Sequence, residues 1–424
     1  MSGRNAGSML LDAEQEAGRP LRAMIEIADR CNEVCVHCYQ EQGLKGEMTT
    51  EQLESVIDQL AELGVLILTI SGGEATLRKD FLRIMKHARA RGFVLRLFTN
   101  GLTMTRELAR ELHRLAVDVV EISLYSHRAE VHDFVTGVPG SFAKTVAGIG
   151  HLVEVGVHTH VKSPVMSVNE DAIDAYLDFV ESLGVTYALD PQVLSPREHS
   201  SLDPAALDRT VAGLAALVRN PRVGESRQVV QTPTERRRPC GAGESIHIEP
   251  DGSIRPCVVL PMEMGHALEG GGVADSQAST VRAQLAELTW AHVHGCRECD
   301  LQSHCGRCHA QALAEAGDAL GPYPSACAAA AERYRYVHDG ALTTEGATGP
   351  YRVEGAVARA FEDRVTLEDD ARASRLGWVR RAAAPAVAAS IARPGVLVQL
   401  RRPGLKRARP ERVPGEGGAV DAAE

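Results

Sequence analysis

Short apolar runs alternate with longer amphipathic stretches between residues 21 and 190. The apolar runs have the length of β-strands and lie at 21–28, 65–70, 93–98, 117–124, 157–165 and 185–190. The stretches between them carry apolar residues at helical spacing and predict helices at 50–63, 79–90, 106–115, 142–155 and 171–183. This alternation is typical of repeated βα units around a parallel sheet. It predicts an α/β fold of six such units, a partial (β/α)6 TIM-like barrel rather than the closed eight-stranded form.

The pattern changes outside this core, which we assign to residues 21–199. Residues 1–20 form an N-terminal extension, and residues 200–239, with one short helical pattern, are interpreted as a linker. Residues 240–338 hold seven of the ten cysteines and contain a predicted hairpin turn at Asp251-Gly252.

The C-terminal residues 345–424 are rich in Ala, Pro and Arg and are predicted to be a disordered tail. Between residues 371 and 413 this tail has eleven Arg or Lys and one acidic residue, Glu411. The alternative is a basic arm that captures an acidic peptide or a nucleic acid.

The amino-acid composition excludes several classes of protein. Hydrophobic residues make up 44% and charged residues 24% of the chain, which excludes a wholly disordered chain and a membrane protein. No apolar run is long enough for a membrane helix, and no secretory signal precedes the core, so we expect a cytoplasmic protein that contacts no membrane. The net charge of −10 makes nucleic acid an unlikely partner.

Ten cysteines in a reducing compartment favour metal binding or catalysis over disulfides. Three of them, Cys31, Cys35 and Cys38, follow the first predicted strand. Polar or glycine-rich residues also follow the other strands: SGGEA after the second, TNG after the third, Ser123 at the end of the fourth, Pro164–Asn169 after the fifth and Asp190 at the end of the sixth. Because the carboxyl ends of parallel strands meet at one rim, these residues are predicted to share a site.

The C-x3-C-x2-C spacing supplies three thiolates, the ligands that iron–sulfur clusters use. A fourth thiolate is absent from this loop, so one iron of a four-iron cube would stay open to an outside ligand. The rival interpretation is a zinc site completed by His37, which would place neighbouring residues on one tetrahedral ion.

The three cysteines in CNEVCVHC, with SGGE at the end of the next strand, resemble the radical S-adenosylmethionine (SAM) enzymes. The resemblance implies that Cys31, Cys35 and Cys38 hold a [4Fe–4S] cluster whose open iron binds SAM. It further implies that the reduced cluster cleaves SAM to a 5′-deoxyadenosyl radical, which abstracts a hydrogen atom from the substrate.

The same resemblance assigns roles to other residues. His37 would lie against the adenine, and Gly72 and Gly73 would let the backbone approach the ammonium group of SAM, with the Glu74 carboxylate nearby. The family often continues with Pro where this chain has Ala75. Ser123 matches a position that binds the ribose or carboxylate of SAM, and Lys162 is a candidate partner for that carboxylate.

The seven later cysteines resemble the SPASM extension of radical SAM enzymes, which carries auxiliary iron–sulfur clusters. The family's crossed ligation would put Cys296, Cys299, Cys305 and Cys327 on one cluster and Cys240, Cys257 and Cys308 on the other. Only two residues separate Cys305 from Cys308, where the family usually has three. The cluster with three thiolates would take a non-cysteine ligand or keep an open iron for substrate.

A zinc ribbon remains an alternative for this segment. It would be built from Cys296, Cys299, Cys305 and Cys308, whose spacing falls within the range of zinc knuckles.

The resemblance implies an oxidoreductase-type enzyme that matures a ribosomal peptide or protein side chain. The alternatives are a small-molecule enzyme of porphyrin or quinone-cofactor biosynthesis, and a non-enzymatic iron–sulfur or zinc redox sensor. The expected partners are the peptide substrate and an electron donor such as flavodoxin or ferredoxin. Thirty residues before Cys31 are too few for a leader-recognition domain, so we expect leader capture to need a separate protein, the SPASM surface or the basic tail. Asp190 and Tyr125 are the candidate catalytic residues.

Overall fold

The computed structural model describes residues 19–40, 43, 46–190, 193, 211–224, 238–296 and 299–337. Six parallel strands follow one another in chain order across the sheet. They are β1 (Arg22–Glu26), β2 (Ile67–Ser71), β3 (Val94–Thr99), β4 (Val119–Ser123), β5 (Thr159–Pro164) and β6 (Thr186–Asp190). The prediction of six βα units around a parallel sheet is confirmed. Residues 1–18 of the predicted extension, residues 200–210 and 225–237 of the predicted linker and the whole predicted tail, 345–424, lie outside the described residues.

The sheet continues on the other side of β1 into the cysteine-rich segment. Strand β7 (Ile246–Ile248) pairs with β1 in parallel, and β8 (Ser253–Arg255) and β9 (Gly265–His266) follow antiparallel. His247 lies opposite Arg255, so the predicted hairpin turn at Asp251-Gly252 is confirmed. The segment between Cys240 and Cys257 is therefore part of the same sheet as the βα core.

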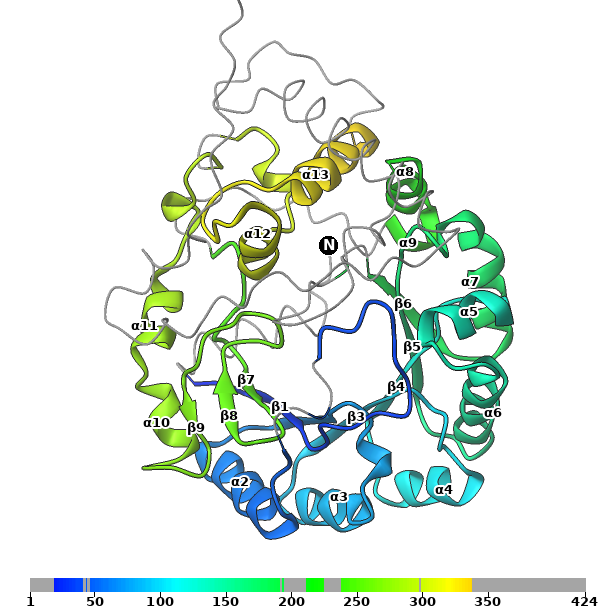
Figure 1. Cartoon of the computed structure of the whole chain (residues 1–424), viewed down its shortest axis with the longest axis vertical. Helices are drawn as coiled ribbons and strands as arrows, with labels where there is room; N and C mark the ends of the chain where they lie inside the picture. Colours follow the sequence, from blue (N-terminus) through cyan, green and yellow to red (C-terminus); the bar gives the residue numbers. More distant parts are fainter. Residues whose placement is uncertain are drawn as a thin grey trace, which may run out of the picture.

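Helices cover the outer face of the six strands (Figure 1). They are α2 (Thr50–Leu63), α3 (Phe81–Ala90), α4 (Arg106–Arg114), α5 (Ala129–Thr136), α6 (Ser141–Glu154) and α7 (Ile173–Ser182), with short 3-10 helices η1 (Ala75–Leu77) and η2 (Glu170–Ala172). The Thr49 side chain accepts from Gln52 at the start of α2, and Gly64 ends it in a left-handed conformation. Helix α5 was not predicted.

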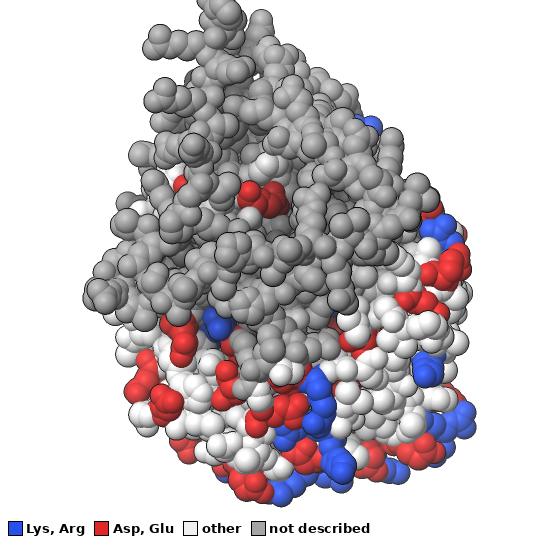
Figure 2. Space-filling model, in the orientation of Figure 1, with Lys and Arg blue, Asp and Glu red and all other residues white. Residues whose placement is uncertain are grey.

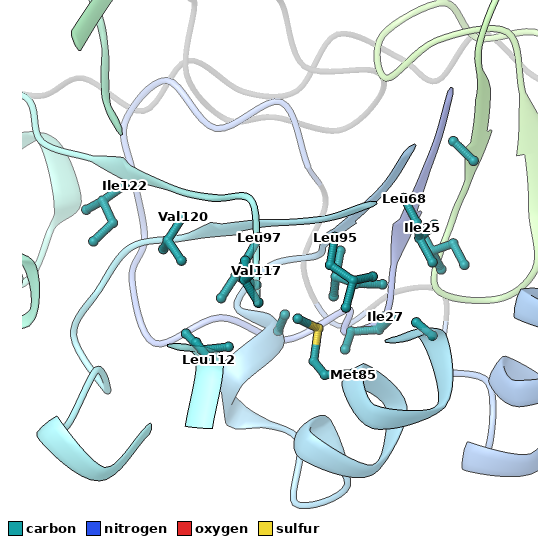
Figure 3. Packing of buried hydrophobic residues seen from close by; sticks show 14 of the residues in the cluster. Ile25, Ile27, Leu68, Met85, Leu95, Leu97, Leu112, Val117, Val120 and Ile122 are labelled. Carbon is teal, nitrogen blue, oxygen red and sulfur yellow. The ribbon is translucent and has the colours of Figure 1, made fainter. Parts of the chain in front are cut away.

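Alternate residues of the strands point into the layer between sheet and helices. Ile25, Leu68 and Leu97 pack there with Met85 of α3 and Leu112 of α4, as Figure 3 shows. Each is buried, and complete burial of such a side chain contributes about 1.5–3 kcal/mol. The intervening residues therefore face the concave side of the sheet, where the loop after β1 also lies (Figure 1).

The C-terminal part of the described chain extends from the β9 edge of the sheet, where it contacts α2, across the open side of the arc of strands (Figure 1). It comprises α8 (Val211–Arg219), α9 (Pro221–Gly224), α10 (Val273–Gln277), α11 (Thr280–Glu287), η4 (Trp290–His292), η5 (Gln302–His304), α12 (His309–Ala316) and α13 (Pro324–Val337). Helix α8, within the predicted linker, packs Leu214 and Val218 against Ala328 and Ala329 of α13. The linker thus contributes a helix that contacts the cysteine-rich segment.

Charges of both signs are interspersed on the part of the surface that Figure 2 colours. On α2 and α3, for example, Arg83 pairs with Glu54 at 2.8 Å, and Arg91 pairs with Asp58. None of the described helices is both long and apolar enough to cross a membrane.

Candidate active site

The loops that follow β1 and β2 run side by side beyond the strands themselves. Gly73 N–H donates to the Ala28 carbonyl at 2.8 Å, and Glu74 N–H donates to the Arg30 carbonyl at 2.9 Å. These bonds continue the pairing of the two strands into the loops. They place Cys31 directly beside the Gly-Gly-Glu turn, which brings together the two motifs that the sequence singled out.

Two glycines make this close approach possible. A Cβ atom on Gly73 would lie 2.5 Å from the Arg30 carbonyl oxygen and 3.2 Å from Cys31 Cβ. Gly72 has a φ of +147°, and a Cβ there would lie 2.7 Å from the Ala28 oxygen. Both glycines are therefore required by the chain before Cys31, and their predicted approach to SAM stays a prediction.

The cysteine loop is held on its other side by α5. Val34 N–H donates to the Thr136 carbonyl and Val36 N–H to the Val135 carbonyl, each at 2.9 Å. Gly137, which ends α5, also packs closely, because a Cβ there would lie 2.9 Å from the Val34 oxygen. The sequence AEVHDFVTG, a short amphipathic stretch closed by glycine, was the available signal for this helix.

The thiols of this loop lie in an environment of negative charge. Burial raises the pKa of Cys31 to about 12 and that of Cys35 well above its usual value. In both cases the negative charges of the Glu33 carboxylate and of Cys38 add to the increase, whereas the Glu33 backbone N–H opposes it at Cys31. Cys35 Sγ lies 3.3 Å from the Glu33 carboxylate. Ionising these thiols therefore requires a positively charged partner, which the iron core of a cluster supplies.

N–H donors also surround the sulfur of Cys31. The Glu33 backbone N–H donates to it at 3.4 Å, and the Asn100 side-chain amide lies 3.7 Å from it. Across the described parts of the chain, no three His, Cys, Asp or Glu side chains converge closely enough to hold a single metal ion. Three thiols grouped in one loop suit a cube in which each thiolate binds its own iron. The residues present fit a [4Fe–4S] cluster.

Glu74 joins the ends of the second and third strands. Its side chain is 1% exposed. Its carboxylate accepts from the Thr76 N–H at 3.1 Å, the Thr99 hydroxyl at 2.9 Å and the Asn100 N–H at 2.8 Å. Burial nevertheless raises its pKa. These contacts show a carboxylate that positions Asn100 beside Cys31; the expected role toward the SAM ammonium stays a prediction.

Sequence reasoning missed Asn100 as a site residue, although TNG was noted as a rim loop. Its side-chain amide also donates to the Asn32 side-chain oxygen at 2.7 Å. It therefore touches the cysteine loop at two consecutive residues. Glu33, which contacts both Cys31 and Cys35, was also missed, because an acidic residue within a cysteine loop gives no distinct sequence signal.

An aromatic group closes one side of the cysteine loop. His37 contacts Tyr125 edge to face, with ring centroids 4.9 Å apart, and burial lowers the pKa of His37 to about 4. The Tyr125 hydroxyl lies 3.9 Å from Cys35 Sγ, and burial raises its pKa well above the usual value. A hydrogen bond with Ser123 acts in the opposite direction. The structure thus brings together three predicted residues, His37, Ser123 and Tyr125, of which Tyr125 contacts Cys35.

His132 of α5 packs against Tyr125, and its protonation between about pH 6.5 and pH 4 can be measured. Its Nδ1 accepts from the Tyr125 N–H at 3.2 Å, and burial lowers its pKa to about 4. As the pH falls, His132 therefore takes up a proton at a higher pH in the unfolded chain than in the folded one. The free energy of unfolding consequently decreases as the pH falls from about 6.5 to about 4. We expect the titration of His132 to lower the free energy of unfolding by about 2 kcal/mol when the pH is changed from 7.5 to 5.

The measurement is urea unfolding of the wild type and a His132→Gln variant at both pH values. Glutamine retains an acceptor for the Tyr125 N–H but does not titrate. The variant should therefore lose less stability on acidification than the wild type. Equal losses in the two proteins would show that His132 is not held neutral by the fold.

Lys162 and Asp190 lie on the outer two strands of the barrel. Lys162 forms an ion pair with the buried Glu121 of β4 and lies over the Phe98 ring, 4.0 Å from its centroid. Glu121 also pairs with Arg96 at 3.1 Å. Asp190 ends β6 with an exposed side chain, and its carbonyl accepts from the Val165 N–H. The roles expected of Lys162 and Asp190 stay predictions.

The seven later cysteines separate into two groups. Cys308 forms a hydrogen bond with Cys240 and interacts electrostatically with Cys257, and all three pack on one apolar cluster. Cys305 interacts with Cys296, Cys299 and Cys327. Burial raises the pKa of Cys296 to about 11 and that of Cys327 to about 12. None of the ten cysteines forms a disulfide.

These two groups have the same members as the crossed ligation that the SPASM resemblance implies. Each brings partly buried thiols close together. Cys240 and Cys308 share a hydrogen bond, which lowers the pKa of Cys240 and raises that of Cys308, and in the other group Cys327 and Cys296 raise the pKa of Cys305. Each group therefore fits a cationic iron–sulfur core. A zinc ribbon would require Cys308 on the same ion as Cys296, Cys299 and Cys305. The structure instead places Cys308 with Cys240 and Cys257.

Comparison with known proteins identifies relatives. Residues 25–180 match the profile of the Radical SAM superfamily. The chain is 30% identical over 313 residues to the antilisterial bacteriocin subtilosin biosynthesis protein AlbA of Bacillus subtilis, covering 69% of this chain and 68% of AlbA. It is 33% identical over 155 residues to Fe-coproporphyrin III synthase of Methanosarcina barkeri, covering 36% of this chain and 39% of that enzyme.

A solved structure shares the fold. The structure of anSMEcpe with bound AdoMet superimposes with a TM-score of 0.63 at 16% sequence identity. The match covers 76% of this chain and 97% of anSMEcpe, so it extends well beyond the six-stranded core.

Proposed function

The chain belongs to the radical SAM superfamily and is a radical SAM enzyme, and from this premise we propose that it modifies a peptide or protein side chain. The observation that carries the proposal is the extent of the similarity to AlbA, a bacteriocin biosynthesis protein. That similarity spans 69% of the chain, whereas the superfamily profile ends at residue 180. The similarity to AlbA therefore includes part of the cysteine-rich segment. This segment distinguishes the chain from a protein that has only the radical SAM core.

We propose the following roles for the residues of the candidate active site. Cys31, Cys35 and Cys38 would hold the catalytic [4Fe–4S] cluster beside the SAM site. A reduced cluster with SAM supplies hydrogen-atom abstraction from an unactivated carbon. Glu74 would fix the neighbouring loops, as its hydrogen bonds to Thr99 and Asn100 support. The buried pair of His37 and Tyr125 would exclude water from the reacting groups.

Further roles belong to the same proposal. Gly72 and Gly73 would also expose backbone groups to the SAM ammonium, Ser123 would bind its ribose or carboxylate, and Asp190 would be the candidate acid or base. Lys162 could reach the SAM carboxylate only by sharing its charge with Glu121, with which it is paired.

The two later cysteine groups would hold auxiliary clusters that carry electrons to or from the substrate. The proposed partners are a peptide substrate, a flavodoxin or ferredoxin as electron donor, and a separate protein that binds a leader peptide. The proposed location is the cytoplasm, where thiols stay reduced.

Mass spectrometry tests the proposal. Protein reconstituted with iron and sulfide under anaerobic conditions is incubated with SAM, dithionite and each short peptide encoded beside its gene. We expect one peptide to lose hydrogen atoms in a reaction that also releases 5′-deoxyadenosine. The Cys31/Cys35/Cys38→Ala variant is the control and should leave every peptide unchanged. If 5′-deoxyadenosine forms but no peptide changes mass, the peptide proposal is wrong.

A small-molecule substrate is the second candidate, and one observation favours it. Fe-coproporphyrin III synthase is 33% identical to this chain, although the match covers only 39% of that enzyme. The same incubation with iron-coproporphyrin III in place of the peptide separates the two candidates. Loss of carboxyl groups from the porphyrin would establish the second.

A further inference from the structure

The group formed by Cys240, Cys257 and Cys308 supplies three thiols, whereas a [4Fe–4S] cube has four irons to ligate. The surroundings of these thiols are mainly apolar. They include Ala242, Leu260, Met262, Leu285 and Leu288. The nearby carboxylate Glu244 is ion-paired with Arg238 at 2.9 Å. A fourth ligand from the protein would therefore have to be another polar side chain at this cluster of residues.

His309 has the required features. It follows Cys308 directly at the start of α12, and its side chain is 3% exposed. Its Nδ1 lies 2.8 Å from the Ala319 carbonyl oxygen. Because a carbonyl only accepts, Nδ1 carries the hydrogen, and the lone pair of the neutral ring is on Nε2. The imidazole is thus held in the tautomer that binds metal through Nε2.

The position of His309 relative to the thiols supports the same role. Cys240 accepts a hydrogen bond from the His309 backbone N–H, and the two side chains interact electrostatically. Ala319, whose carbonyl holds the ring, packs in the same apolar cluster as Cys240 and Cys308. The ring is therefore anchored at the edge of the three-thiol group.

We propose that His309 is the fourth protein ligand, through Nε2, of the auxiliary [4Fe–4S] cluster held by Cys240, Cys257 and Cys308. Metal-bound histidines almost always donate their other N–H to a carbonyl or carboxylate, as His309 does to Ala319. The inference rests on the auxiliary clusters of the proposed function. It implies that this cluster has no open iron for substrate and acts in electron transfer. It also implies a higher reduction potential than four cysteines would give.

Pulsed electron paramagnetic resonance of the reduced clusters tests this ligand. The sample is the full-length Cys31/Cys35/Cys38→Ala variant, in which only auxiliary clusters remain, prepared with natural and with 15N-labelled histidine. We expect strong coupling to a directly bound nitrogen that changes with the label. The coupling should disappear in His309→Ala and persist in His294→Ala, a matched change at an exposed histidine of the same segment.

The outcomes are distinct from those of the peptide experiment, because no peptide is present. If a fully iron-loaded sample shows no histidine coupling, or if the coupling survives His309→Ala, the proposal is overturned, whatever the peptide result. Zinc instead of iron at this group would overturn it as well. If His309→Ala fails to load its cluster, His309→Cys decides the matter. It should load fully, lose the nitrogen coupling and have a lower reduction potential than the histidine protein.

Discussion

Replacing Cys31, Cys35 and Cys38 together with alanine is expected to lower the iron content of the reconstituted protein from roughly 12 to roughly 8 per chain. The same variant should release no 5′-deoxyadenosine from SAM. The physical reason is that these three partly buried thiols form one group, held between the Gly-Gly-Glu turn and α5, so that removing them eliminates one complete site. The later cysteine groups lie on other elements and should keep their clusters.

Iron, sulfide and zinc are measured on the same anaerobic samples. A Cys296/Cys299→Ala variant is the matched control, because it also removes buried thiols but leaves the loop after β1 intact. It should lose iron and still retain the catalytic cluster. About 4 iron with stoichiometric zinc in the wild type would contradict the account of the later cysteines, since it would indicate a structural zinc module.

Gly73→Ala is expected to reduce SAM cleavage by about a hundredfold, the cost typical of misplacing a reacting group by about 1 Å. The new Cβ would lie 2.5 Å from the Arg30 oxygen and 2.7 Å from its carbonyl carbon. These are backbone atoms that cannot rotate away, so the chain leading into Cys31 must move. The measurements are 5′-deoxyadenosine release and iron content of the reconstituted variant.

Gly150→Ala is the matched control for this glycine. It lies within α6, where an added Cβ meets no atom within 4 Å, and alanine favours the helix by about 1 kcal/mol. It should keep wild-type cluster content and activity. Wild-type SAM cleavage by Gly73→Ala, with thermal stability unchanged, would show that the close packing of the two loops does not position Cys31.

The sequence predicted the core well because its strands are short runs of largely buried residues and its helices are amphipathic. The helix predicted at 50–63 has those bounds in the structure, and each predicted strand overlaps an observed one. The prediction failed at α5, which is short and has His132 rather than an aliphatic residue at a buried position. The parallel pairing of β7 with β1 could not be predicted either, because a strand of three residues carries no sign of its partner.

The sequence predicted which motifs form the candidate site, but not which atoms of these motifs contact one another. Spacing along the chain identified Cys31, Cys35 and Cys38 and the turn at Gly72 and Gly73. It could not show that Gly73 packs against the chain before Cys31, since that depends on the pairing of two loops. Lys162 illustrates the same limit, because its partner Glu121 comes from the neighbouring strand.

The most direct test of the central claim is transfer of deuterium from a peptide into 5′-deoxyadenosine. The reconstituted wild-type protein is incubated with SAM, dithionite and the peptide that changes mass, uniformly deuterated at carbon. The account predicts 5′-deoxyadenosine that contains deuterium, formed together with the modified peptide. Modified peptide accompanied only by unlabelled 5′-deoxyadenosine would contradict hydrogen-atom abstraction from a peptide at this site.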